Sequence, residues 1–137
     1  MATWHSEILI TTSPLQSRPN RWSGAAGASV DFWGVVRTLE DGREIAGIEY
    51  EAHQTMAQRQ MEMLAEAARI EFGLEELTLQ HRIGFVAAGE ASLFLRVASA
   101  HREAAFHASS WIVTELKKKV PIWKRPLFVR QRRPVTS

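Results

Sequence analysis

Two segments with apolar residues at helical spacing constrain the fold of this chain more than any other feature. They span residues 53–72 and 102–118, and Gly73 and Pro121 follow them as stop signals. The stripes are Ala57, Met61, Leu64 and Ala68 in the first segment, and Ala105, Ala108, Ile112 and Leu116 in the second. The sequence therefore predicts two long helices, each packed against the core along one face.

Strands are predicted around both helices, because apolar and polar residues alternate there. In residues 28–37, for example, Val30 faces one side and Asp31 the other. Residues 45–52 are expected to return beside this strand as a hairpin, through a turn at residues 39–44. The predicted strands span residues 7–10, 28–37, 45–52, 76–83, 92–98 and 126–130.

The order of these elements predicts the fold class. Residues 11–27 are expected to form a loop and residues 84–91 a turn, and Pro126 places the last strand at a sheet edge because proline cannot donate to a ladder. Paired strands alternating with two helices indicate an α+β (mixed α/β) fold and not a doubly wound parallel sheet. The 137 residues suit one domain spanning residues 1–137.

Several functional classes are excluded by composition. The chain has no cysteine, which excludes disulfides, zinc–thiolate sites and thiol nucleophiles. Its histidines lack ligand spacing, since His101 and His107 lie about 240° apart around a helix. We therefore expect no metal and no cofactor. No signal peptide or membrane-length apolar run is present, so a cytoplasmic protein without membrane contact is expected.

Positive charge is concentrated at the C-terminal end of the chain. Eight of the 17 Lys and Arg residues, and none of the 15 Asp and Glu residues, lie from residue 117 onward. This asymmetry indicates an anionic ligand or partner. Lys117 lies in the last turn of the second helix, where lysine also suits the helix dipole. Lys124 follows the apolar segment Val-Pro-Ile-Trp, which is expected to be a rigid turn that could hold it as an acid, base or nucleophile.

Further candidate residues lie at the other end of the same helix. Ser99 is a plausible N-cap, and His101 and Arg102 then fall beside free backbone N–H groups, where an anion can bind. Arg102 and Lys117 are separated by roughly 22 Å along the helix axis, so they cannot both touch one small ligand within a single chain. Either they serve two sites, or a second copy supplies one of them. Arg37, at the end of a predicted strand, is a weaker candidate.

Three segments together resemble a known family. "GASVDFWGVVR", "GIEYEAHQTMAQRQM" and "HRIGFVAAGEASLFLRVASAHREAAFHASSWIVTELKKKVPIWKR" are similar to the large, catalytic subunit of molybdopterin synthase, over residues 8–125. The spacing of the "SAHR" and "VPIWK" segments is the most specific part of this similarity. The resemblance implies an α/β hammerhead fold with an added antiparallel β subdomain.

The resemblance also implies a function and an assembly. In this family a homodimer of large subunits binds two small ubiquitin-like subunits, giving a heterotetramer. The C-terminal Gly-Gly thiocarboxylate of the small subunit supplies sulfur to cyclic pyranopterin monophosphate (precursor Z), which becomes molybdopterin, the dithiolene precursor of molybdenum cofactor. By position, the catalytic lysines correspond to Lys117 and Lys124, and the substrate-binding residues to Arg37, His101 and Arg102, the last two reaching the neighbouring subunit's site.

The sequence departs from this family after Arg125. Residues 126–137 form a short basic tail without acidic residues, in which Arg130, Arg132 or Arg133 could take the place of the family's basic tail residue. Two alternatives to a sulfurtransferase remain open. One is a non-catalytic paralogue that dimerises and docks a ubiquitin-like partner. The other is a nucleic-acid binder, which is disfavoured because the basic tail has few aromatic residues for base stacking.

Overall fold

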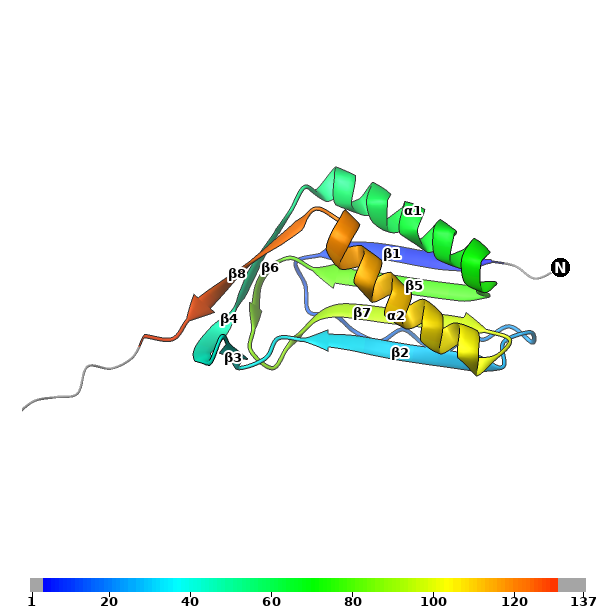
Figure 1. The fold of residues 1–137 in the computed structure, drawn as a ribbon, viewed down its shortest axis with the longest axis horizontal. Helices are drawn as coiled ribbons and strands as arrows, with labels where there is room; N and C mark the ends of the chain where they lie inside the picture. Colours follow the sequence, from blue (N-terminus) through cyan, green and yellow to red (C-terminus); the bar gives the residue numbers. More distant parts are fainter. Residues whose placement is uncertain (1–3, 131–137) are drawn as a thin grey trace, which may run out of the picture.

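The computed structural model describes residues 4–130. A four-stranded main sheet carries both helices on one face (Figure 1). Its elements are β1 (His5–Thr11), β2 (Ala28–Val35), β5 (Glu76–Arg82), β7 (Ala91–Ser99), α1 (Gln54–Phe72) and α2 (Arg102–Lys119). The strand order is β1-β5-β7-β2, in which the β1–β5 pair is parallel and the other two pairs are antiparallel. The mixed α+β class predicted from the sequence is confirmed.

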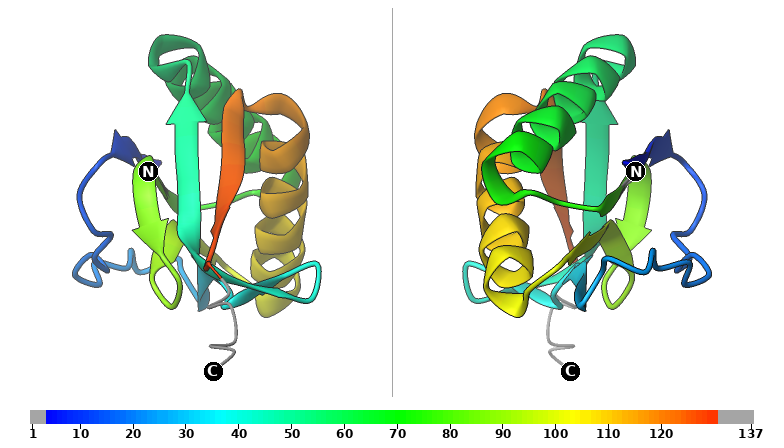
Figure 2. Two further views of the ribbon diagram at one scale, coloured as in Figure 1. Left: turned by 90° about the vertical axis from the view of Figure 1, so that its left-hand side faces the viewer. Right: turned by 90° about the vertical axis from the view of Figure 1, so that its right-hand side faces the viewer.

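A smaller antiparallel sheet lies at one end of the main sheet (Figure 1). It consists of β3 (Leu39–Glu40), β4 (Arg43–Ala52), β6 (Gly84–Ala87) and β8 (Ile122–Phe128), and β4 pairs with each of the others. The end-on views show β4 and β8 side by side (Figure 2). Because β4 leads into α1 and β8 follows α2, both helices meet this small sheet. The His53 N–H ties the two junctions by donating to the Pro121 carbonyl at 3.3 Å.

The helices begin and end at residues suited to those positions. The His53 side chain caps α1 by accepting from the Met56 N–H at 3.2 Å, and Gly73 ends it with φ 63°, which glycine adopts without strain. All residues of both predicted stripes are buried. They pack on the leucine and valine side chains of β5 and β7 to form the main core.

Within residues 4–130, neither helix is long and apolar enough to cross a membrane.

The predicted hairpin between residues 28–37 and 45–52 is wrong. β2 pairs with β7, while β4 belongs to the small sheet. Alternation predicts which face of a strand is buried but not which strand lies beside it. Residues 84–91 are also more than a turn, because Gly84–Ala87 form β6, with Val86 fully buried between exposed or half-buried neighbours.

Two further predictions near α2 need correction. The last strand begins at Ile122 and ends at Phe128 instead of spanning residues 126–130, so Lys124 lies within a strand and not after a turn. Pairing with β4 extends residues that the sequence presents as a proline-led turn. Ser99 does not cap α2: its hydroxyl donates to the His101 carbonyl at 2.5 Å, and His101 is the N-cap residue.

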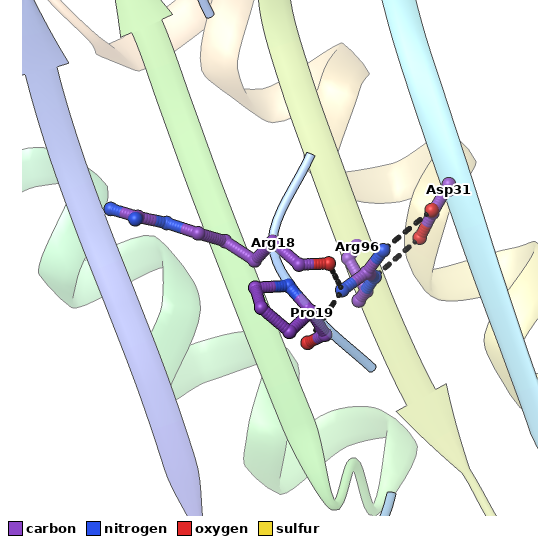
Figure 3. A network of polar contacts seen from close by, with 4 residues as sticks. All are labelled: Arg18, Pro19, Asp31 and Arg96. Carbon is purple, nitrogen blue, oxygen red and sulfur yellow. Dashed lines mark hydrogen bonds and ion pairs between the residues drawn. The ribbon is translucent and has the colours of Figure 1, made fainter. Parts of the chain in front are cut away.

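A loop, residues 12–27, crosses the face of the main sheet opposite the helices, and we call it the strap. Arg96 of β7 holds it by donating from one guanidinium nitrogen to the carbonyl oxygens of Arg18 (2.8 Å) and Pro19 (3.4 Å) (Figure 3). The other two guanidinium nitrogens bind both carboxylate oxygens of Asp31, at 2.7 and 2.8 Å. Asp31 and Arg96 are direct cross-strand neighbours on β2 and β7.

Candidate functional site

A cleft of about 640 Å³ lies where the two sheets and the end of α2 meet. Its walls come from the ends of β2 and β5 and the start of β7 in the main sheet, from β3, β4 and β8 in the small sheet, and from the last turns of α2. Three cationic side chains line it, namely Arg37, Lys117 and Lys124. Three of the five residues that the sequence predicts for the site are thus brought together, although they come from segments up to 87 positions apart.

The local fold explains how the two lysines reach one cleft. Leu116 and Val120 are buried on either side of Lys117, which fixes the last turn of α2 against the body of the protein. The chain then enters β8, where Lys124 pairs with Tyr50 of β4. Lys117 is therefore held by a helix and Lys124 by a strand, and both line the same cavity.

The remaining lining residues of the cleft are partly apolar and partly polar. Apolar residues from β2, α2 and β8 contribute side chains such as Phe32, Val113 and Ile122. The polar part consists of Tyr50, His81 and Ser92, in which the Tyr50 hydroxyl donates to the Ser92 hydroxyl at 3.2 Å. The Tyr50 and His81 rings meet edge to face at 5.2 Å between centroids. Because the Tyr50 proton is engaged by Ser92, the Ser92 hydroxyl is the group among these three that can donate to an anion bound beside the lysines.

His81 is the most buried titratable group among the lining residues of the cleft, with 7% of its surface exposed. Burial lowers the pKa of His81 from its usual 6.5, and the hydrogen bond to the Arg82 carbonyl only partly opposes this effect. Its Nδ1 lies 2.8 Å from that carbonyl oxygen, which can only accept. Nδ1 therefore carries the proton of the neutral ring, which leaves Nε2 as an acceptor.

A single carboxylate, that of Glu40, is found among the described residues that line the cleft. Glu40 ends β3, and its Oε1 lies 4.0 Å from Lys124 Nζ. Lys118 and Lys119 turn away from the cleft and pair with Glu115 on α2. Such ion pairs within a helix, and lysines near its C-terminal end, are common on protein surfaces and need no functional explanation.

His101 and Arg102 do not line this cleft. They lie at the opposite end of α2, where both are exposed, and 80% of the Arg102 side chain is accessible. Its only ion-pair contact within residues 4–130 is a 3.7 Å approach to Glu103. The separation that helix length predicts between Arg102 and Lys117 therefore holds within one chain.

The basic tail is only partly described by the structure. Pro126, Leu127 and Phe128 belong to β8, and Arg130 is exposed just beyond it. Arg132 and Arg133 lie outside the described residues, so their suggested role stays a prediction.

Four polar lining residues were not predicted from the sequence, namely Glu40, Tyr50, His81 and Ser92. A signal was available for His81, because it follows Leu77 and Leu79 at alternate positions of β5, on the face that those leucines bury. A histidine at such an inward position is a candidate for a buried site. Glu40 offered no comparable signal, since it sits in a polar turn.

Comparisons with known proteins agree with this architecture. Residues 9–119 match the family model described as MoaE protein. A rice (Oryza sativa subsp. indica) protein named molybdopterin synthase catalytic subunit is 38% identical over 104 residues, which are 76% of this chain and 54% of that protein. The chain thus spans about half the length of the rice relative.

Two further matches cover more of the partner's length. A Thermoplasma volcanium protein, also named molybdopterin synthase catalytic subunit, is 40% identical over 103 residues, which are 75% of this chain and 75% of that protein. An X-ray crystal structure of molybdopterin synthase from Staphylococcus aureus aligns with a TM-score of 0.82 at 28% identity. That alignment covers 89% of this chain and 91% of the other.

Proposed function

The chain belongs to the MoaE protein family, and we propose that it is the catalytic subunit of a molybdopterin synthase. The observation that carries this proposal is the cleft in which Arg37, Lys117 and Lys124 meet. Three cations around a half-apolar cavity suit a ligand that is anionic at one point and ring-like elsewhere. A phosphorylated pterin and a thiocarboxylate tail both meet this description.

The proposed reaction is sulfur transfer to precursor Z. Because the chain has no cysteine, sulfur cannot travel on a thiol of its own. We infer that it arrives on the C-terminal Gly-Gly thiocarboxylate of a small ubiquitin-like subunit, whose tail enters the cleft. Lys117 and Lys124 then orient the thiocarboxylate and exchange protons as its sulfur bonds to the pterin side chain. Water then hydrolyses the acyl–sulfur bond, so that the sulfur stays on the pterin and the tail leaves as a carboxylate, while Arg37 binds substrate oxygens.

A homodimer completes the site in this proposal. His101 and Arg102 lie too far along α2 to reach the cleft of their own chain. A two-fold arrangement that brings the start of one α2 near the end of the other would supply them from the second copy. With one small subunit at each cleft, the assembly is a heterotetramer.

The experiment that tests the activity is a reconstituted reaction with precursor Z and a thiocarboxylated small subunit. Lys117→Ala and Lys124→Ala are each expected to lower turnover by roughly 100-fold or more, because each removes a charged group at the reacting atoms. Lys118→Ala and Lys119→Ala are matched controls on the same helix turn and should retain turnover within about twofold. Full activity in both cleft variants would remove these lysines from the mechanism.

The dimer is tested by mixing inactive variants. Arg102→Ala and Lys117→Ala subunits, mixed and allowed to exchange, would form one intact site per mixed dimer and recover roughly a quarter of wild-type activity. If each site used one chain only, the mixture would stay inactive. Tight binding of the small subunit without product in the wild-type protein would instead favour a non-catalytic docking role.

A further inference from the structure

The Glu40 carboxylate is out of place in a cleft that is otherwise cationic. It is the one acidic side chain among the described lining residues, and 21% of it is exposed. It repels any anion that enters, so it weakens the binding that Arg37, Lys117 and Lys124 favour. Its position therefore needs a reason, and the only cation within 4.0 Å of it in residues 4–130 is Lys124.

The two cleft lysines differ in their partners. Lys124 Nζ lies 4.0 Å from Glu40 Oε1, with 58% of the lysine side chain exposed. Lys117 has no carboxylate within that distance among residues 4–130, because the nearest acid on α2, Glu115, pairs with Lys118 and Lys119. The charge of Lys124 is thus partly offset before a ligand arrives, whereas that of Lys117 is not.

Glu40 and Lys124 also differ in how freely their side chains can move. β3 is only two residues long and leads into a turn with Asp41 at φ 51° and Gly42 at φ 75°, so Glu40 is held by a tight reversal. Lys124 is a long side chain on a strand and can swing between Glu40 and the cleft interior. At 4.0 Å and partial exposure the pair is weak enough to exchange for a ligand.

We propose that Glu40 is a positioning residue, whose carboxylate holds the Lys124 ammonium at the cleft until an anionic tail replaces Glu40 as its counter-ion. Lys117 is then the first lysine to bind that tail. The proposal rests on the proposed function and assigns different roles to its two lysines. Lys117 binds the incoming carboxylate or thiocarboxylate first. Lys124 leaves Glu40 and binds the same group only when the tail occupies the cleft.

Glu40→Gln tests this directly, with Asp41→Asn as the matched control. Both variants remove one negative charge from the same turn, but Asp41 does not line the cleft. The probe is a synthetic peptide ending in Gly-Gly with a free carboxylate, and calorimetry gives its Kd. We expect Glu40→Gln to bind the peptide roughly two- to fivefold more tightly, and Asp41→Asn to match wild type.

A double-mutant cycle shows whether the effect passes through Lys124. In a Lys124→Ala background, Glu40→Gln should change the Kd much less than it does in the wild-type protein. In the reconstituted reaction, Glu40→Gln should lower both KM and kcat, because the tail binds better while Lys124 is misplaced. A merely structural role would not tighten binding. Glu40→Asp should restore part of the wild-type behaviour.

Three results would overturn the proposal: equal tightening by both variants, weaker binding in Glu40→Gln, or a gain that is just as large in the Lys124→Ala background. A readout that needs no activity separates it from the proposed function. The ¹³Cε signal of Lys124 in lysine-labelled protein should shift in Glu40→Gln and not in Asp41→Asn. An unchanged signal refutes the positioning role, whereas an inactive wild-type protein refutes the sulfur-transfer function alone.

Discussion

Removing Asp31 is expected to destabilise the protein more than removing its partner Arg96. The two side chains form a bidentate ion pair, but they differ in burial, since 4% of the Arg96 side chain and 37% of the Asp31 side chain are exposed. Asp31→Ala leaves a buried guanidinium without its counter-ion. Arg96→Met leaves a carboxylate that water can reach, and methionine keeps much of the apolar stem.

The magnitudes follow from that difference. Removing one partner of a buried ion pair, so that the other charge is left unpaired, costs about 3–5 kcal/mol. We expect Asp31→Ala to lie near the low end, at about 3 kcal/mol, because the two strap carbonyls still accept hydrogen bonds from Arg96. Arg96→Met loses those carbonyl bonds and the pair itself, at about 1–2 kcal/mol in all, because Asp31 becomes hydrated. The double variant should be less destabilised than the sum of the two, and no worse than Asp31→Ala alone.

Urea denaturation followed by tryptophan fluorescence measures these differences. All variants must be compared at one protein concentration, because the proposed homodimer would make the free energy of unfolding depend on concentration. A larger loss in Arg96→Met than in Asp31→Ala would refute the reasoning, and so would additivity in the double variant. Faster tryptic cleavage after Arg21 in Arg96→Met would show that the strap has been released.

Two further predictions concern the cleft and its walls. Burial holds the pKa of His81 below 6.5, so below that pH the unfolded state binds a proton that the folded state does not. The free energy of unfolding therefore falls as the pH falls below about 6.5, by at most about 1.4 kcal/mol per pH unit. In urea titrations from pH 7 to 5, His81→Gln should flatten this slope and the exposed-site control His107→Gln should not; equal slopes would contradict the assignment. Gly47→Ala places a methyl group 2.4 Å from the Val86 carbonyl oxygen, so it should cost about 1–3 kcal/mol and lower turnover by displacing β6 from β4. Gly24→Ala, which meets open space, should change the free energy of unfolding by less than about 0.5 kcal/mol, and equal losses in both variants would refute the packing argument.

The sequence predicts helices and strands well where one face of the helix or strand packs against the main core. Both helical stripes, and the strands that became β2, β5 and β7, are found close to their predicted positions because period and burial agree there. Pairing is harder, since β2 and β4 both show alternation and are separated only by residues 36–42, which include β3. Their assignment to different sheets depends on β7 and β8, which lie far along the chain.

The candidate site shows the same limit. Helix length alone separates Arg102 from Lys117, and the absence of cysteine already excludes a thiol nucleophile of the chain itself. The approach of Glu40 to Lys124 could not be foreseen, because it needs β3 and β8 to flank the same strand. His81 and Tyr50 likewise become neighbours only through contact between the two sheets.

The way Arg96 holds the strap has a consequence for how this segment can evolve. The guanidinium binds main-chain oxygens of residues 18 and 19, atoms that every amino acid carries. Substitution at these two positions therefore leaves the contact with Arg96 intact, provided that the path of the backbone is kept, although replacing Arg18 also removes its ion pair with Glu7 of β1. The strap is thus a place where side chains can diverge between relatives, or where an epitope could be grafted, provided that the length of the loop and Arg96 itself are kept.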